Sequence, residues 1–165
     1  MIGLILCAGK SIRLREETKD KPKCMVDICG KPVLEHIADH MNKHGIWRIV
    51  VNLHAFPEVV MKHFGQRFLY IYEPVPAGER ATLAFVKSWF PGEPILMMNG
   101  DTITNIDIDR IGQGVRCISK ETKLHIGTTL FSADTNETSD LDFKCEYFDI
   151  GDPEGLLAAR KHYVE

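Results

Sequence analysis

Short apolar runs alternate along the chain with segments in which apolar residues recur at helical spacing. Each run shows little alternation with polar residues, so each is expected to form a strand buried on both faces, as in a parallel sheet covered by helices. The runs lie at residues 2–6, 47–53, 68–72 and 94–98. The strand–helix alternation predicts an α/β fold with a Rossmann-like, doubly wound and mostly parallel sheet.

Proline and glycine mark the ends of the predicted helices. The first opens at Lys31-Pro32, because proline fits a first helical turn, and it ends at Gly45. The third is expected to turn Leu83, Ala84 and Val86 toward the core. The three predicted helices cover residues 32–44, 57–64 and 81–89.

The pattern is weaker after residue 101. Asp152-Pro153-Glu154 combines an N-cap residue, a first-turn proline and an acid, so it predicts a C-terminal helix that continues to Val164. The segment before it contains a polar loop at 134–142. The other predictions are a short helix at 106–111 and strands at 115–119, 124–131 and 143–150.

Composition narrows the class of protein. A chain of 165 residues that is 44% hydrophobic and 26% charged fits a single globular domain, 1–165. The net charge of −3 argues against a nucleic-acid binder. The sequence contains no long apolar segment and no signal peptide, so we expect a cytoplasmic protein without a membrane partner. Five cysteines without CxxC spacing support neither a disulfide framework nor a zinc site.

A cation-rich loop follows the first predicted strand. The strand ends in a small-residue turn at Ala8-Gly9, and residues 10–31 contain seven cations and four acids. Backbone N–H groups of such a turn can cradle phosphates while Arg13 and Lys23 neutralise them. The loop matches neither GxxxxGK[ST] nor GxGxxG, so an ordinary solvent-exposed loop is the alternative.

Three turns follow the carboxyl ends of predicted strands, where ligands bind in open α/β sheets. They are Ala8-Gly9, residues 74–78 and Gly100-Asp101. Asp101 follows a buried strand and is a candidate Mg²⁺ ligand, because Mg²⁺ takes one or two carboxylates together with phosphate oxygens. Asp149 stands among apolar residues at a strand end; a buried acid there needs a partner, and either a shared metal or a turn cap is possible.

Together these motifs resemble the sugar-1-phosphate nucleotidylyltransferases, in a shortened form. The family opens with L-A-G-G-x-G-T-R-L, then P-K and G-K-P. This chain has LCAGKSIRL at Leu6–Leu14, then Pro22-Lys23 and Gly30-Lys31-Pro32. The order and spacing of the motifs agree over residues 1–109 and again over 124–165.

Three later motifs complete the resemblance. Gly78 is similar to the glycine of the base-binding P-L-G-T turn. Asn99-Gly100-Asp101 is similar to the N-G-D that carries a metal aspartate, and Asp149–Glu154 to D-I-G-x-P-E, which carries the second. The motif style is similar to that of mannose- or heptose-1-phosphate guanylyltransferases.

The resemblance implies a nucleotide-binding half at 1–109, an acceptor- and metal-binding half at 110–165, and a role for each matched residue. Arg13 would hold the triphosphate, Lys23 would contact the reacting phosphates, and Asp101 and Asp149 would bind Mg²⁺ as cofactor. The implied substrates are a nucleoside triphosphate (GTP, CTP or dTTP) and a phosphorylated small-molecule acceptor. The implied nucleotide contacts are Leu6, Ala8, Gly9, Lys10, Ser11, Gly78, Asn99 and Gly100.

The chain departs from the family at several points. Ser11-Ile12 replaces Gly-Thr in the first loop, and Glu79-Arg80 replaces the small residues usual after Gly78. Only 47 residues separate Asp101 from Asp149, so the acceptor-binding extension is expected to be reduced. Its remnants there are Glu121 and Gly127.

The reduced extension leaves two alternative functions open. One is a transferase of the same fold that acts on a smaller phosphorylated alcohol or on a cofactor such as the molybdenum cofactor. The other is a non-catalytic nucleotide-binding remnant. Apolar surface left uncovered would favour a homodimer formed through residues 106–145.

Three histidines, His36, His40 and His44, recur at four-residue spacing on one face of the first predicted helix. A metal stripe is conceivable there. A solvated or interface edge is the favoured interpretation, because no nearby cysteine or acid is expected to complete a site.

Overall fold

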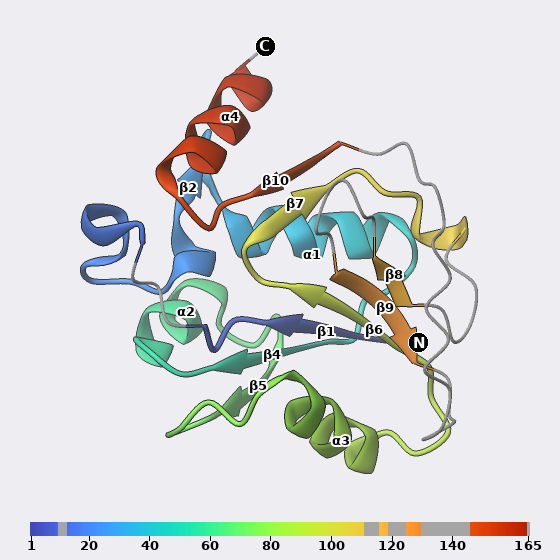
Figure 1. Ribbon diagram of the computed structural model, residues 1–165. Coiled ribbons are helices and arrows are strands. Elements are labelled where there is room, and N and C mark those ends of the chain that lie inside the picture. Colours follow the sequence, from blue (N-terminus) through green and yellow to red (C-terminus); the bar gives the residue numbers. More distant parts are fainter. Residues whose placement is uncertain (10–12, 111–115, 119–124, 130–145, 165) are drawn as a thin grey trace.

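A computed structural model describes residues 1–9, 13–110, 116–118, 125–129 and 146–164 (Figure 1). One central sheet carries helices on both faces, and a smaller two-stranded sheet leads to the C-terminal helix. Within these ranges no helix is long and apolar enough to cross a membrane.

The central sheet has six strands in the order β5-β4-β1-β6-β9-β8. The first four strands of that order run parallel, β9 pairs antiparallel with β6, and β8 pairs antiparallel with β9. The predicted mostly parallel, doubly wound α/β sheet is therefore confirmed. The strand bounds are β1 (Ile2–Leu6), β4 (Ile49–Leu53), β5 (Leu69–Tyr72), β6 (Ile95–Asn99), β8 (Arg116–Ile118) and β9 (His125–Thr129).

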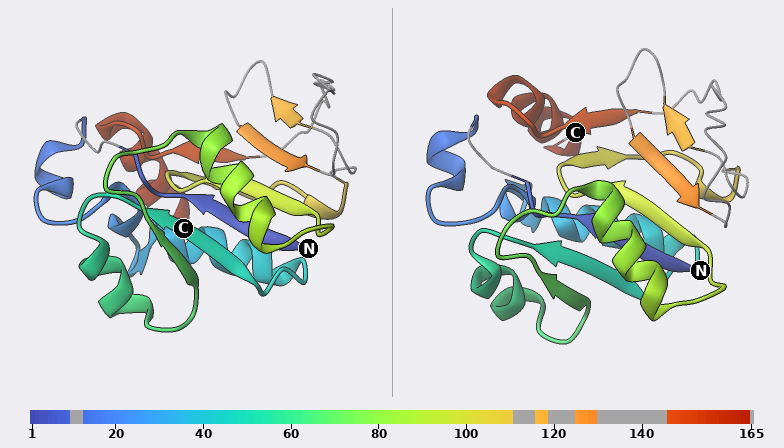
Figure 2. Two further views of the ribbon diagram at one scale, coloured as in Figure 1. Left: turned by 90° about the horizontal axis from the view of Figure 1, so that it is seen from below. Right: turned by 60° about the horizontal axis from the view of Figure 1, so that its bottom comes forward.

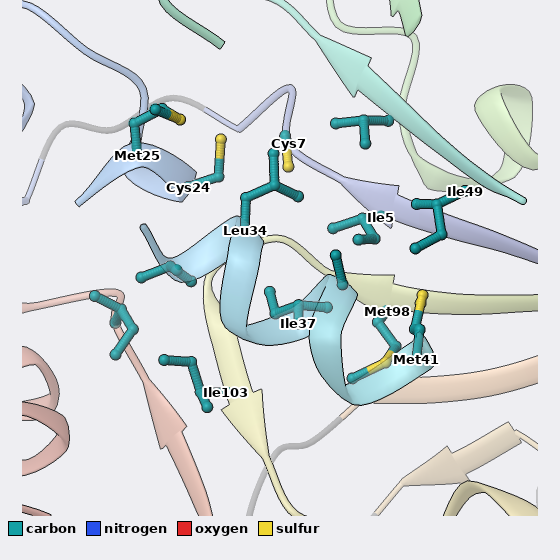
Figure 3. Close-up of a cluster of buried hydrophobic side chains, with 14 of the residues drawn as sticks. Ile5, Cys7, Cys24, Met25, Leu34, Ile37, Met41, Ile49, Met98 and Ile103 are labelled. Carbon is teal, nitrogen blue, oxygen red and sulfur yellow. The ribbon is translucent and has the colours of Figure 1, made fainter. Parts of the chain in front are cut away.

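Helices cover both faces of this sheet (Figure 2). Helices α1 (Val33–Lys43) and α2 (Pro57–Phe64) pack on one face, and α3 (Glu79–Trp89) packs on the other. The larger core lies under α1, where Leu34, Ile37 and Met41 face the sheet (Figure 3). This burial on both faces explains why β1 and β4 are continuous apolar runs.

A second layer of short elements lies beyond α1. Strand β7 (Thr102–Thr104) pairs antiparallel with β10 (Tyr147–Asp149), and β10 leads into α4 (Pro153–Val164). Strand β2 (Asp27–Ile28) pairs with β3 (Lys31–Pro32). The single turns of 3-10 helix are η1 (Arg15–Thr18), η2 (Lys23–Met25) and η3 (Ile108–Arg110).

One predicted helix boundary and one predicted inward-facing residue were wrong. Lys31-Pro32 forms strand β3 and the helix begins only at Val33, because Lys31 pairs with Ile28 in a hairpin. In α3 the prediction for Ala84 was wrong: Ala84 is exposed, and Thr82 is buried beside Val86. The pairing partner of Thr82, described below, explains why a polar residue occupies the inward face.

The start of the C-terminal helix is confirmed. The Asp152 side chain accepts a hydrogen bond from Gly155 N at 3.0 Å, and α4 begins at Pro153. The predicted strands at 115–119 and 124–131 correspond in part to β8 and β9. The polar loop at 134–142 lies outside the described residues.

Candidate functional site

The carboxyl ends of β1, β4 and β6 are in register at one edge of the sheet. Leu6 pairs with Asn52 on one side and with Asn99 on the other. The Ala8-Gly9 turn, residues 74–78 and Gly100-Asp101 all follow strands that end at this edge. The predicted convergence of three turns is confirmed.

Gly100 packs directly against the first turn. Its N–H donates to Leu6 O at 2.9 Å, and a Cβ at Gly100 would lie 2.4 Å from Cys7 Sγ and 2.6 Å from Leu6 O. Only glycine allows the two backbones to approach this closely. By contrast, a Cβ at Gly9 would meet no atom of the described residues within 4 Å, so none of those residues closes the turn on that side.

Lys23 and Asp101 meet beside this turn. Lys23 Nζ donates to Asp101 Oδ2 at 2.9 Å, and the two side chains are 15% and 31% exposed. The 3-10 turn η2 brings Lys23 to this position. A small open hollow borders the ion pair, and it is lined by Leu6, Cys7, Gly9, Lys23, Cys24, Gly100 and Asp101.

Cys7 lines this hollow, but its thiol is not expected to react. Burial, together with the neighbouring Cys24 and Asp101, raises the pKa of the Cys7 thiol well above its usual value. A protonated, buried thiol is a poor nucleophile. Cys7 is therefore not expected to act as a nucleophile at this edge.

Arg13 lies across the start of α4. It is exposed, and its Nη1 is 4.0 Å from Asp152 Oδ2. A Cβ at Gly151 would lie 2.8 Å from Arg13 Nη2, so the guanidinium passes close to the turn between β10 and α4. The structure thus brings the two predicted phosphate-binding cations to the two predicted aspartate motifs, Lys23 to the first and Arg13 to the second.

Asp149 differs from the expectation that it is buried. Its side chain is exposed, and Oδ1 accepts a hydrogen bond from Gly151 N at 2.7 Å, which is the geometry of a turn cap. The premise of a buried acid without a partner was wrong, because β10 lies at the surface. A carboxylate that caps a turn through one oxygen can still use its other oxygen for a ligand.

The two aspartates nevertheless come from adjacent backbone segments. Asp149 pairs with Thr102 in the β7–β10 sheet, and Ile150 N donates to Asp101 O at 2.7 Å. Asp101, in the turn before β7, and Asp149, at the end of β10, carry hard oxygen donors of the type that Mg²⁺ prefers. The donor chemistry of the predicted metal residues therefore fits Mg²⁺, while its binding stays a prediction.

Gly78 marks the other end of the edge. Its φ of +86° is a conformation that residues with a Cβ rarely adopt, and its carbonyl accepts from Thr82 N at 3.0 Å as α3 begins. A Cβ there would meet none of the residues that the structure describes within 4 Å. Backbone conformation, rather than crowding in this structure, explains the glycine.

Two buried polar residues at this edge were missed by the sequence analysis. Asn52 at the end of β4 is 4% exposed and Glu73 after β5 is 7% exposed. Burial raises the pKa of Glu73, but hydrogen bonds from Thr82, Asn52 and Ala77 N outweigh it and lower the pKa below its usual value. Polar residues at the ends of apolar runs were the available signal, since buried polar groups need partners.

Some predicted residues cannot be placed. Lys10, Ser11, Ile12 and Glu121 lie outside the described residues. Gly127 lies in β9, opposite Met97 of β6 and Arg116 of β8.

The three histidines of α1 make local structural contacts. A ring nitrogen of His36 lies 3.0 Å from Ile28 O, one of His40 lies 2.8 Å from Ile106 O, and His44 Nδ1 lies 3.1 Å from Asp109 Oδ2. Burial lowers the pKa of His40. The expectation that no acid is near was wrong for His44, since Asp107 and Asp109 are its neighbours. Both acids are exposed, and such clusters are common without a metal.

The fold and this edge define a nucleotide-binding class of α/β domain, with glycine turns, cations and carboxylates gathered at the carboxyl ends of parallel strands. The chain belongs to the family of MobA-like NTP transferase domains, whose sequence profile matches residues 3–111.

Individual relatives agree with this assignment. The chain is 34% identical over 120 residues to D-glycero-alpha-D-manno-heptose 1-phosphate guanylyltransferase of Campylobacter jejuni. The matched region covers 67% of this chain and 52% of that protein. The chain is 29% identical over 133 residues to N-acetylmuramate alpha-1-phosphate uridylyltransferase of Neisseria meningitidis, covering 76% and 58%. The chain spans about half the length, or less, of the first curated relatives that it matches.

A solved structure confirms the fold. HddC from Yersinia pseudotuberculosis, complexed with GMP-PN, superposes with a TM-score of 0.71 at 20% identity, covering 98% of this chain and 99% of that one. At this identity the similarity establishes the architecture alone. The Rossmann-like fold inferred from the sequence is thus supported by topology, family and structural similarity.

Proposed function

We propose that this chain is a nucleotidyltransferase that moves a nucleoside monophosphate from a nucleoside triphosphate to a sugar 1-phosphate. The products are a nucleotide sugar and pyrophosphate. The observation that carries the proposal is the Lys23–Asp101 ion pair beside the Gly9 and Gly100 backbones, with the Asp149 strand hydrogen-bonded to Asp101. The named activities of the relatives support the same reaction class.

The chemistry is an in-line displacement. An oxygen of the acceptor phosphate forms a bond to the α-phosphorus, and the bond from that phosphorus to the bridging oxygen of the β-phosphate breaks. The attacking phosphate is already an anion, so no general base is required. The site then has to hold the two reactants in line and neutralise their charge.

Different residues at this edge of the sheet would bind the phosphates, neutralise their charge and contact the base. The open Ala8-Gly9 turn offers backbone N–H groups to the phosphates, and Lys23 supplies a cation next to the reacting centre. Arg13, which is exposed beside Gly151, would hold the triphosphate. Gly78 lets the base approach at the far end of the edge.

Asp101 and Asp149 are the residues that would hold Mg²⁺. When bound, the ion supplies charge neutralisation and orients the phosphates. Lys23 Nζ donates to Asp101 Oδ2 in this structure, and this contact holds the carboxylate in place. GTP is the first candidate nucleotide, because the Campylobacter relative is a guanylyltransferase, and CTP, dTTP and UTP follow.

A screen for released pyrophosphate tests the proposal. GTP, CTP, dTTP and UTP are each combined with Mg²⁺ and a panel of sugar 1-phosphates that includes mannose and heptose types. Turnover with at least one pair is expected. Turnover only with a smaller phosphorylated alcohol would replace the acceptor class, and nucleotide binding without any turnover would favour the non-catalytic alternative.

Matched lysine variants connect that activity to the site. Lys23→Met is expected to lower turnover by about 100-fold or more, because one charge-stabilising contact at a reacting phosphate has an effect of that order. Lys19→Met, in the same loop but exposed, is the control and should stay within about twofold. Asp101→Asn should abolish turnover while the protein stays folded. Equal activity of the Lys23 and Lys19 variants would contradict the assignment.

A further inference from the structure

A buried chain of hydrogen bonds joins the turn after β1 to the turn after β5. Cys7 N donates to Asn52 Oδ1 at 2.7 Å, and Asn52 Nδ2 donates to Glu73 Oε1 at 3.0 Å. The other carboxylate oxygen, Glu73 Oε2, accepts from Ala77 N at 2.9 Å. Two side chains therefore connect the backbones of residues 7 and 77, which are far apart in the sequence.

These hydrogen bonds lie in the interior of the protein and fix the orientation of the Asn52 and Glu73 side chains. Asn52 is 4% exposed and Glu73 is 7% exposed. Thr82 Oγ1 adds a second hydrogen bond to Glu73 Oε1 at 2.6 Å, so both carboxylate oxygens are satisfied. The amide of Asn52 can only serve both neighbours in one orientation, with its oxygen toward Cys7 N and its nitrogen toward Glu73.

Stability alone does not account for this arrangement. A buried carboxylate loses hydration, and a well-packed apolar residue of similar volume often stabilises a fold as well or better. What an apolar pair cannot supply is a defined hydrogen bond to each turn. Fully satisfied buried polar networks rigidify and specify a single local structure.

We propose that Asn52 and Glu73 are positioning residues that hold the turn at Cys7–Gly9 in fixed register with the turn at Pro74–Gly78. This inference rests on the proposed function, in which the first turn receives the phosphates and the second the base of one nucleotide. Because one ligand would have to contact both turns at once, a change in their separation is expected to weaken its binding. Asn52 is the central link, since it is the residue that touches both the first turn and Glu73.

Two near-isosteric variants separate this role from general stability. Asn52→Leu and Thr82→Val each remove one donor to the same oxygen, Glu73 Oε1, and each replaces a buried polar side chain with an apolar one. Only Asn52→Leu also cuts the link to Cys7 N. Asn52→Asp is a second variant that keeps an acceptor for Cys7 N but places a carboxylate against Glu73.

The measurements are the dissociation constant for the Mg²⁺ complex of the NTP that the screen selects, and amide hydrogen exchange without nucleotide. Asn52→Leu and Asn52→Asp should weaken nucleotide binding by at least about tenfold, and Thr82→Val by no more than about threefold. Exchange at Ala77 N, which Asn52 does not touch, should accelerate in Asn52→Leu more than in Thr82→Val.

Opposite results would overturn the proposal. Binding by Asn52→Leu at the wild-type level, or equal losses in Asn52→Leu and Thr82→Val, would show that Asn52 contributes packing only. If the wild-type protein binds no nucleotide, the proposed function fails, and the exchange measurement still decides whether the two turns are coupled. Unchanged exchange at Ala77 in Asn52→Leu would end the proposal on its own.

Discussion

At the scale of single residues, Gly100 and Gly9 of the candidate site differ in whether a side chain would fit at their position. Gly100 is required by contact, because a Cβ would meet Cys7 Sγ and Leu6 O at 2.4 and 2.6 Å. For Gly9, no atom of the described part of the chain lies within 4 Å of where a Cβ would be. The sequence motifs contain both glycines, but only the structure distinguishes a glycine that fits a backbone contact from one that leaves room at an open surface.

This difference predicts opposite effects on stability. Gly100→Ala should lower the free energy of unfolding by about 2–3 kcal/mol, because the new methyl group meets a backbone oxygen that cannot move independently. Gly9→Ala should change it by less than about 0.5 kcal/mol. Urea denaturation of both variants checks the pair, and a Gly100→Ala protein as stable as the Gly9→Ala protein would refute the close contact.

Glu73 makes stability depend on pH in a defined direction. Its pKa is lowered in the folded protein, so its ionised form contributes stability at pH values above its unfolded pKa. That contribution is lost as the pH falls through the folded pKa. Relative to Glu73→Gln, the wild type should be more stable at neutral pH by about 1–3 kcal/mol, since the Gln nitrogen would oppose Ala77 N–H.

Thermal unfolding of wild type and Glu73→Gln from pH 7 to the acid limit of folding measures this difference. The two curves should converge as the pH falls. Curves that stay parallel across the whole range would mean that Glu73 is not ionised in the folded protein.

At the scale of elements, the apolar runs located β1, β4, β5 and β6, helical spacing located α1, α2 and α3, and the cap signals at residues 152–154 located α4, although the predicted start of α1 was wrong. Strands β2, β3 and β7 were not predicted, because two or three residues are too few to show a hydrophobic pattern. Thr82 on the inward face of α3 was missed because its partner, Glu73, lies in another element. Periodicity shows which face is apolar, not which polar residue has a buried partner.

In the candidate site, too, the residues marked by local sequence patterns were predicted, and those defined by contacts between elements were missed. Arg13, Lys23, Gly78, Gly100, Asp101 and Asp149 were singled out by their place after predicted strands and by the resemblance, and the structure brings these residues to one edge. Asn52 and Glu73 belong to no motif that was recognised. Their roles depend on contacts between strands β1, β4 and the turn after β5, which no local pattern records.

Arg160 of helix α4 contacts the cation-rich loop through its side chain. Arg160 pairs with both carboxylate oxygens of Glu17, at 2.8 and 3.2 Å, and its Nε donates to Asp27 O at 3.2 Å. The pair is more than one-third exposed, so its contribution to global stability should be below about 1 kcal/mol. Its main effect is expected to be local, on the loop that leads to Lys23.

Arg160→Gln should therefore accelerate amide exchange in residues 15–29 with little change in unfolding temperature. Lys161→Gln, exposed on the same helix, is the matched control. Equal exchange in the two variants would show that Arg160 does not order the loop.

At the scale of the whole molecule, the described residues form the six-stranded sheet with its helices and the strand β10 that ends at Asp149, followed by α4. The predicted dimer surface, 106–145, lies largely outside the described residues, so the homodimer stays a prediction. Light scattering coupled to gel filtration should give about twice the mass of the 18.7 kDa chain. A monomeric mass at high protein concentration would contradict the predicted homodimer.

The central claim is that this one edge of the sheet transfers a nucleoside monophosphate. Phosphorus NMR of the full chain with Mg²⁺, a nucleoside triphosphate and a sugar 1-phosphate tests it most directly, because it follows every phosphorus of both reactants. The prediction is that the sugar phosphate and triphosphate signals fall together while a sugar-linked diphosphate and pyrophosphate appear in equal amounts, and that Asp101→Asn shows none of this. Unchanged signals with every pair in the panel, or products of triphosphate hydrolysis alone, would contradict it.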